Sequence, residues 1–212
     1  KSGSRTTSHL RFGPNPIEAP YLVTKAGFIG IHAWGILESI DVLTMAREGT
    51  TVLLNSPYGP DEVWGKLPRT FQQQVVDKKL DLWTIDALSV AREVGLRNRT
   101  NTILQTCFFA ISGVLPKDEA IERIKDSIQK TYGKKSQKIV DMNHAAVDAS
   151  LEHLFQVKVP ESVNANHDLV EPVRDDSPEF VKTITAKMIT GEGALLPVSS
   201  LPADGTYPAG TT

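Results

Sequence analysis

The sequence predicts an α/β fold: a three-layer αβα sandwich with a mostly parallel sheet, followed by an irregular C-terminal arm. Two observations lead to this prediction. From residue 6 to residue 95, short apolar runs alternate with stretches of helical spacing, which is typical of a parallel sheet between helices. Beyond residue 160 the periodicity fades, and Asn, Asp, Pro and Ser accumulate.

Composition narrows the class of protein. The length of 212 residues suits one domain with an extension, or two small domains. Lys and Arg number 23 against 25 Asp and Glu, so charge gives no reason to expect nucleic acid or an anionic membrane as partner. No apolar run approaches the roughly 20 residues of a membrane span. The single cysteine, Cys107, excludes an internal disulfide and any metal site built from several cysteines of this chain, and it fits a reducing, cytoplasmic compartment.

The first strands are expected near the N-terminus. Residues 6–12 alternate in the manner of a strand, and residues 28–32 form a second apolar run. Residues 35–47 carry apolar side chains at mixed helical spacing, and a helix is predicted there. The run Thr51–Leu54 is short, apolar and β-branched, which predicts a central strand covered on both faces.

Turn formers follow this central strand at once. Asn55, Ser56 and Pro57 take the chain out of the sheet at the carboxyl end of the strand. In open α/β sheets ligands bind at that edge. An ordinary connection between a strand and a helix explains the same pattern, and the spacing alone favours it.

Helical patterns then become more frequent. A helix over 67–79, a strand over 80–85 and a short helix capped by Asp86 complete the alternation. Further helices are predicted over 101–113, from Pro116, from Ser136 to about Phe155, and over 178–189. The predicted division is an α/β domain over 1–160 and a connecting arm over 161–212.

Two asparagines stand out on physical grounds. Asn143 lies four residues after Ile139 and four before Val147, inside the apolar stripe of its helix. A buried amide without partners costs about 1–3 kcal/mol, so backbone, another side chain or a ligand must satisfy it. Asn101 opens an apolar helix directly after Arg97-Asn98-Arg99-Thr100, a combination that suits an anion. A plain helix cap is the alternative interpretation of Asn101, and an internal hydrogen bond is that of Asn143.

Other site motifs are absent from the sequence. It contains no G-x-G-x-x-G, no phosphate-binding G-x-x-x-x-G-K-[ST] and no nucleophile elbow. The histidines show no zinc spacing, and Cys107 within a Phe-rich helix is expected to be a core residue. The residues alone therefore indicate an α/β domain with an anionic ligand.

Several runs together resemble one family, the pyruvate:ferredoxin (flavodoxin) oxidoreductases. The resemblance spans almost the whole chain in the same order. Its runs are Thr7-Ser-His-Leu-Arg-Phe-Gly-Pro14, Leu53-Leu-Asn-Ser-Pro57, Asn101-Thr-Ile-Leu-Gln-Thr-Cys-Phe-Phe109, Gly113-Val-Leu-Pro116, Thr131-Tyr-Gly-Lys-Lys135, Leu196-Pro-Val-Ser199 and Ala203-Asp-Gly205.

The resemblance implies a gamma-type domain that holds coenzyme A, followed by an arm that leads to a ferredoxin-like domain. Carried over by position, the family's contact lysine falls on Lys1, and its two contact asparagines fall on Asn101 and Asn143. The family's N-terminal strand and glycine-rich phosphate loop would precede Lys1, so the chain is expected to be a fragment with an incomplete site. Two departures from the family pattern are Ser4, in place of a frequent glycine, and a less glycine-rich turn at 96–98.

The family's reaction is the oxidative decarboxylation of pyruvate with coenzyme A to acetyl-CoA and CO2, with ferredoxin or flavodoxin reduced. The resemblance implies a homodimeric enzyme whose thiamine diphosphate, Mg and [4Fe-4S] clusters lie in other domains, which would be the partners of this one. The fragment alone is then expected to be inactive, with no catalytic residue and no metal ligand of its own. A different hypothesis is a purely structural, gamma-like scaffold domain without ligand. A third, a free-standing nucleotide-dependent enzyme, is disfavoured by the absent phosphate loop.

Overall fold

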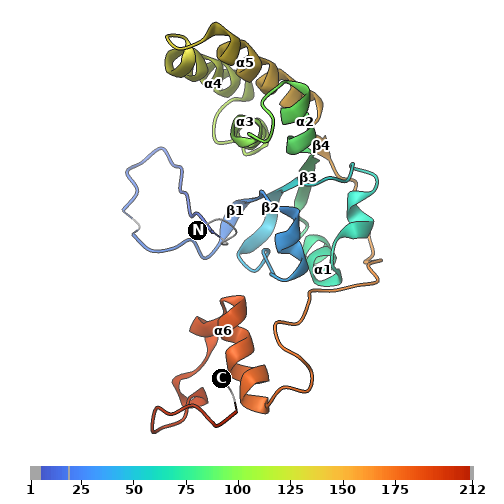
Figure 1. Cartoon of the computed structure of the whole chain (residues 1–212), viewed down its shortest axis with the longest axis vertical. Helices are drawn as coiled ribbons and strands as arrows, with labels where there is room; N and C mark the ends of the chain where they lie inside the picture. The colour runs from blue at the N-terminus through green and yellow to red at the C-terminus, as the bar shows by residue number, and fades with distance from the viewer. Residues whose placement is uncertain (1–5, 19, 211–212) are drawn as a thin grey trace.

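A computed structural model describes residues 6–18 and 20–210 of the chain (Figure 1). One sheet has the strand order β1-β2-β3-β4. Its strands are β1 Ala26–Ile31, β2 Ala46–Asn55, β3 Asp81–Ile85 and β4 Phe155–Gln156. The first three are parallel, and β4 pairs antiparallel with β3. The mostly parallel sheet is therefore confirmed, and the predicted central strand 51–54 lies in the middle of it.

Helices cover both faces of the sheet. Val52 and Leu54 of β2 pack on the face that carries α1 (Arg69–Asp77), together with the 3₁₀ helices η1 (Trp34–Glu38) and η2 (Val63–Lys66). Leu53 points the opposite way, toward α2 (Ala87–Glu93) and α3 (Asn101–Ile111). Figure 1 shows α1 on one side of the sheet and α2 with α3 on the other, which is the predicted three-layer sandwich.

A helical pair extends the second layer away from the sheet (Figure 1). It consists of α4 (Lys117–Tyr132) and α5 (Gln137–Glu152). The two helices meet through a small apolar cluster of Ile124, Ile128, Val140 and Val147. α5 also packs on α3, because Ala146 and the buried Cys107 belong to the core between the sheet and that helix. No helix in the described residues is long and apolar enough to cross a membrane.

Two of the strand and helix predictions are wrong. Residues 6–12 contain no strand, because no neighbouring strand pairs with them; instead Phe12 packs its ring on Phe108, 5.6 Å between centroids. The region 35–47 forms the short helix η1 and then a turn before β2 begins. Asp41 Oδ1 accepts a hydrogen bond from Leu43 N at 3.0 Å, and such a local side-chain bond competes with helix formation.

The first part of the predicted arm is held on α1. The backbone N–H of Arg69 donates to His167 O at 2.9 Å, and the N–H of Thr70 donates to Asp168 Oδ1 at 3.0 Å. Pro68, which precedes the helix, makes no side-chain cap. Residues 167–168 therefore supply the N-terminal cap that the local sequence lacks. Val170 N extends this attachment by donating to Glu38 O at 2.7 Å.

Gln72 fixes the same segment more deeply. Its side chain is 0% exposed, and its Nε2 donates to Trp64 O (2.6 Å) and Asn164 Oδ1 (3.2 Å). Its Oε1 accepts from the backbone N–H groups of Asn164 (2.9 Å) and Ala165 (3.0 Å). All four hydrogen-bonding positions of the amide are thus occupied. We call residues 164–170 the anchored segment.

The remainder of the arm lies apart from the sheet in Figure 1. It contains a π-helical turn η3 (Val181–Thr185) that continues into α6 (Ala186–Thr190), then η4 (Gly193–Leu195) and η5 (Val198–Ser200). Gly191 ends α6 in the left-handed conformation at φ 89°, as glycine does at many helix C-termini. We call residues 171–210 the distal arm.

Candidate functional site

At the carboxyl edge of the sheet, hydrogen bonds from Asn55 and Ser56 join the ends of the strands to each other and to the start of α2. Asn55 Nδ2 donates to His32 O at 2.9 Å, and Asn55 Oδ1 accepts from Ala87 N at 3.0 Å. One amide therefore ties the end of β1 to the start of α2. Ser56 N donates to Ile85 O at 2.9 Å and adds the end of β3. These bonds favour the interpretation of this loop as a connection between strand and helix.

A small hollow of about 180 Å³ lies beside this edge. Its walls come from the loop after β2, the end of β3, α2 and the end of α5, through Pro57, Tyr58, Gly59, Pro60, Thr84, Ile85, Asp86, Ser89, Val90, Glu93, His153 and Phe155. The Thr84 hydroxyl has no hydrogen-bond partner among the described residues, but it is itself buried and closed to solvent. In the wall of the hollow, Ser89 Oγ donates to Asp86 Oδ2 at 2.6 Å, so part of its polar lining is already paired within the chain.

The N-terminus of α3 presents a different environment. Asn101 is the first residue of the helix and is exposed, and no hydrogen bond of its side chain is found in the described part of the chain. The first internal helical bond joins Leu104 N to Thr100 O, so the earlier N–H groups have no helical partner. Arg97 and Arg99, both exposed, precede the helix. Donors, cations and the positive end of the helix dipole together suit an anionic group.

Asn143 lies across from this helix start on α5. It is 6% exposed, as the apolar stripe predicted. Its Oδ1 accepts from Thr102 Oγ1 at 2.9 Å, and its Nδ2 donates to Ile139 O at 2.8 Å. An amide has two acceptor lone pairs and two donor hydrogens, so half of its capacity is used in the described part of the chain. The internal hydrogen bonds that the sequence left open as an alternative are therefore present, but they leave one donor and one acceptor position.

The structure thus brings two of the three expected site positions to one seam. Asn101 and Asn143 are separated by 42 positions in sequence, but Thr102, the neighbour of Asn101, bonds Asn143 directly. Lys1 lies outside the described residues. The sequence interpretation did not identify Thr102, because a threonine in the first turn of a helix carries no distinctive signal of its own.

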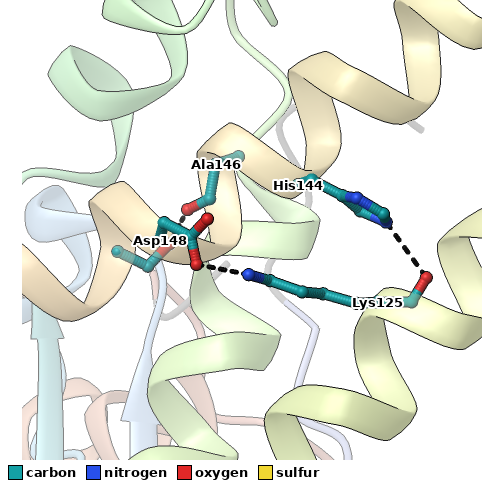
Figure 2. Close-up of polar contacts among 5 residues, drawn as sticks. Lys125, His144, Ala146 and Asp148 are labelled. Carbon is teal, nitrogen blue, oxygen red and sulfur yellow. Dashed lines mark hydrogen bonds and ion pairs between the residues drawn. The ribbon is translucent and has the colours of Figure 1, made fainter.

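The opposite side of α5 has no comparable feature. His144 Nε2 lies 3.1 Å from Lys125 O on α4, and the Lys125 ammonium pairs with Asp148 (Figure 2). Within α5 itself, the Ser150 hydroxyl donates to Ala146 O. The ion pair is partly exposed, and pairs open to solvent contribute little. This seam between α4 and α5 is accounted for by helix packing.

Cys107 is excluded as a nucleophile or metal ligand. Its side chain is fully buried, and burial raises the pKa of the thiol to about 12. The thiolate that either role requires is therefore suppressed at neutral pH. The described residues also contain no group of three or more His, Cys, Asp or Glu side chains arranged to hold a metal ion.

Comparison with protein families gives two matches along the chain. A model described as pyruvate ferredoxin/flavodoxin oxidoreductase matches residues 1–153, and a model described as a domain of unknown function matches residues 166–212. The first covers β1 through α5 and ends before β4. The second begins within the anchored segment and includes the distal arm.

Curated relatives extend the first match to the whole chain. A putative pyruvate-flavodoxin oxidoreductase of Synechocystis sp. is 54% identical, and a pyruvate-flavodoxin oxidoreductase of Rhodospirillum rubrum is 53% identical. A pyruvate:ferredoxin oxidoreductase of Moorella thermoacetica is 42% identical. Each match covers 100% of this chain and 18% of the relative. The chain therefore spans a small part of the length of these proteins.

Among solved structures, pyruvate oxidoreductase subunit PORC of Thermotoga maritima is similar at a TM-score of 0.49 with 17% identity. The similarity covers 64% of this chain and 67% of that subunit.

Proposed function

Because the chain belongs to the pyruvate ferredoxin/flavodoxin oxidoreductase family, we propose that it is the coenzyme A-binding part of a pyruvate:ferredoxin or flavodoxin oxidoreductase. The complete enzyme would convert pyruvate and coenzyme A to acetyl-CoA and CO2 and pass two electrons to ferredoxin or flavodoxin. This chain would bind the coenzyme and dock against the remaining domains. Cytoplasmic location and a homodimeric enzyme are part of the proposal.

The observation that carries the coenzyme A proposal is the half-used amide of Asn143. A buried amide in an apolar stripe costs free energy unless its donors and acceptors are paired. Asn143 keeps one donor and one acceptor position beyond its bonds to Thr102 and Ile139. A phosphate, a ribose hydroxyl or a pantetheine amide can pair with such a position.

The exposed start of α3 supports the same ligand. Coenzyme A carries a 3′-phosphate and a diphosphate, and free backbone N–H groups at a helix N-terminus favour such anions. Asn101 adds an amide at that point, and Lys1 would add a cationic point charge. We propose Lys1, Asn101 and Asn143 as the contact residues on this chain.

The other cofactors of the family would lie elsewhere in the enzyme. A [4Fe-4S] cluster needs several thiolates, and the one cysteine of this chain is buried and protonated. The residues described therefore do not fit a cluster. Thiamine diphosphate with Mg, and the clusters, are proposed for domains outside this chain, and the chain alone should not oxidise pyruvate.

A pure scaffold domain is the second candidate. The two internal hydrogen bonds of Asn143 favour it, because they already offset part of the cost of burying the amide. Under this hypothesis Asn143 would hold α3 against α5 and would contact no ligand. Both candidates predict the same fold, so only binding measurements separate them.

The deciding experiment is titration calorimetry of coenzyme A on the complete enzyme with single substitutions. Lys1→Ala, Asn101→Ala and Asn143→Ala should each weaken binding by about 1–3 kcal/mol. The effect of Lys1→Ala should be the most sensitive to salt, because it removes a charge whereas the two asparagines are neutral. The KM for pyruvate should change little in all three variants.

Two matched controls separate binding from stability. Gln129→Ala removes an exposed amide from α4, and Ser150→Ala removes a buried hydroxyl from α5. Both should bind coenzyme A with wild-type affinity. If the three contact variants fold and also keep wild-type affinity, the binding role fails and the scaffold hypothesis replaces it.

A further inference from the structure

The hydroxyl of Thr102 makes a directional link between α3 and α5. Asn143 Nδ2 faces the carbonyl oxygen of Ile139 at 2.8 Å. A carbonyl can only accept, so this contact fixes which end of the amide is nitrogen. Oδ1 therefore faces Thr102, and the Thr102 hydroxyl must be the donor in the 2.9 Å bond.

A buried residue of the same helix, Thr106, is hydrogen-bonded to the backbone of Thr102. It is half-buried in the first turn of α3, and its carbonyl accepts from Thr106 Oγ1 at 2.8 Å. Thr106 is 0% exposed. The hydroxyl that reaches Asn143 thus projects from a turn that is tied to the interior, directly after Asn101.

The rest of this seam cannot supply the same constraint. Leu104, Cys107 and Ala146 belong to the apolar core that α3 and α5 share. Apolar contact is non-directional and permits small rotations of one helix against another. A hydrogen bond loses strength when its angle or length changes. Thr102 is therefore the side chain that sets where the Asn143 amide points relative to the start of α3.

We propose that Thr102 is a positioning residue of the coenzyme A site, an inference that rests on the proposed function above. Its hydroxyl holds the Asn143 amide in one orientation, with the remaining N–H directed consistently toward the ligand. It also holds Asn143 at a fixed separation from Asn101. Thr102 acts through Asn143 and need not touch the coenzyme.

The test uses the complete enzyme with four variants and calorimetric titration of coenzyme A. Thr102→Val keeps the shape of the side chain and removes the hydroxyl. Thr102→Ser keeps the hydroxyl and removes the methyl group. Asn143→Ala and the double variant Thr102→Val with Asn143→Ala complete a double-mutant cycle.

Thr102→Val should weaken coenzyme A roughly five- to tenfold, which is the loss expected for one neutral hydrogen bond. Thr102→Ser should stay within about twofold of wild type, because the donor is retained. The double variant should bind no worse than Asn143→Ala, because Thr102 acts only through that amide. Ser150→Ala on the same helix is the matched control and should have no effect on binding.

Different results overturn different statements. If Asn143→Ala keeps wild-type affinity, the proposed function fails at that residue, and the role of Thr102 falls with it. If Asn143→Ala weakens binding and Thr102→Val does not, only the positioning role is refuted. A loss of more than about threefold in Thr102→Ser also refutes it, whether or not the valine variant folds, because the serine keeps the donor.

Discussion

Two buried side-chain amides hold two different seams of this molecule. Gln72 joins α1 to the anchored segment and uses all four of its hydrogen-bonding positions within the chain. Asn143 joins α5 to α3 and uses two of four in the described residues. Both amides lie in apolar surroundings. They differ in how many of their hydrogen-bonding positions are used within the chain, and this difference indicates which of them can bind a ligand.

An amide whose four hydrogen-bonding positions are all occupied cannot form a hydrogen bond with a ligand. Gln72 is therefore a structural residue that replaces backbone pairing where the chain runs beside α1 without forming a strand. A half-paired amide near a helix N-terminus keeps capacity for a partner outside the chain. The comparison separates a residue that builds the domain from one that we propose to bind coenzyme A.

The sharpest test of the comparison is Gln72→Met, which keeps the length of the side chain and removes the amide. The N–H groups of Asn164 and Ala165 would lose their partner, and the carbonyl of Trp64 would lose one bond while keeping that from Leu67 N at 3.2 Å. We expect unfolding free energy to fall by about 2–4 kcal/mol. Urea denaturation of the 212-residue chain measures this, and a loss below about 1 kcal/mol would show that water replaces the amide.

Limited trypsin digestion tests the boundary of the anchored region. Lys158 and Arg174 are both exposed, but the chain is hydrogen-bonded to the domain at 157 and again at 164–170. We expect cleavage after Arg174 at least about tenfold faster than after Lys158, because a protease needs local opening. The sequence alone predicted one connecting arm over 161–212 and did not distinguish its anchored first part from the rest.

Equal cleavage at the two sites would contradict the anchoring of 164–170. Gln72→Met provides the internal check, since it should accelerate the cut at Lys158 and leave the cut at Arg174 unchanged. Acceleration at both sites would indicate a general loss of stability.

The matched substitution at the other seam, Asn143→Leu, should cost much less stability than Gln72→Met. It removes two hydrogen bonds, but Thr102 is half-buried and its hydroxyl can turn toward water. We expect a change in unfolding free energy below about 1 kcal/mol. Urea denaturation measures this change from the shift of the midpoint, if the dependence of the unfolding free energy on urea concentration is the same in both proteins. A loss equal to that of Gln72→Met would favour the scaffold interpretation of Asn143.

The part of the fold that follows local periodicity was predictable from sequence. The central strand, α1, α3 and α5 all lie where apolar spacing placed them. The two wrong predictions concern 6–12 and 35–47. Residues 6–12 would need a neighbouring strand to form a strand, and in 35–47 a local turn at Asp41 competes with a longer helix. Alternation in 6–12 satisfies the strand pattern, but no second strand lies beside it.

The candidate site was predictable only in part, for the same reason. Asn143 was recognisable because an amide interrupts an apolar stripe, and that signal is local. Gln72 also neighbours apolar positions of α1, but three of its four hydrogen bonds reach residues 92 and 93 positions away. Thr102 is recognisable only once α3 and α5 are in contact. Long-range pairing of polar groups is what the sequence could not supply.

The smallest expected effect concerns the cap that the anchored segment gives to α1. Burial would raise the pKa of Asp168, but hydrogen bonds from Thr70 and Leu169 and the charge of Arg69 outweigh it and hold the pKa below its usual value. A carboxyl with a lowered folded pKa stabilises the fold above its unfolded pKa of about 3.9. This contribution is lost as pH falls through the still lower folded pKa.

Wild-type chain should therefore lose slightly more stability between pH 6 and pH 3 than Asp168→Asn, which has no charge to lose. The difference should stay under about 1 kcal/mol, because Asp168 is exposed and solvent screens its interactions. Asp126→Asn is the matched control: Asp126 is exposed on α4, and no hydrogen bond or ion pair of its side chain is found in the described part of the chain. The control removes a carboxylate that caps no helix, so it should lose stability with acid as the wild type does. If Asp168→Asn and Asp126→Asn respond to acid identically, the anchored segment does not cap α1 through its carboxylate, and the seam depends on Gln72 and the backbone alone.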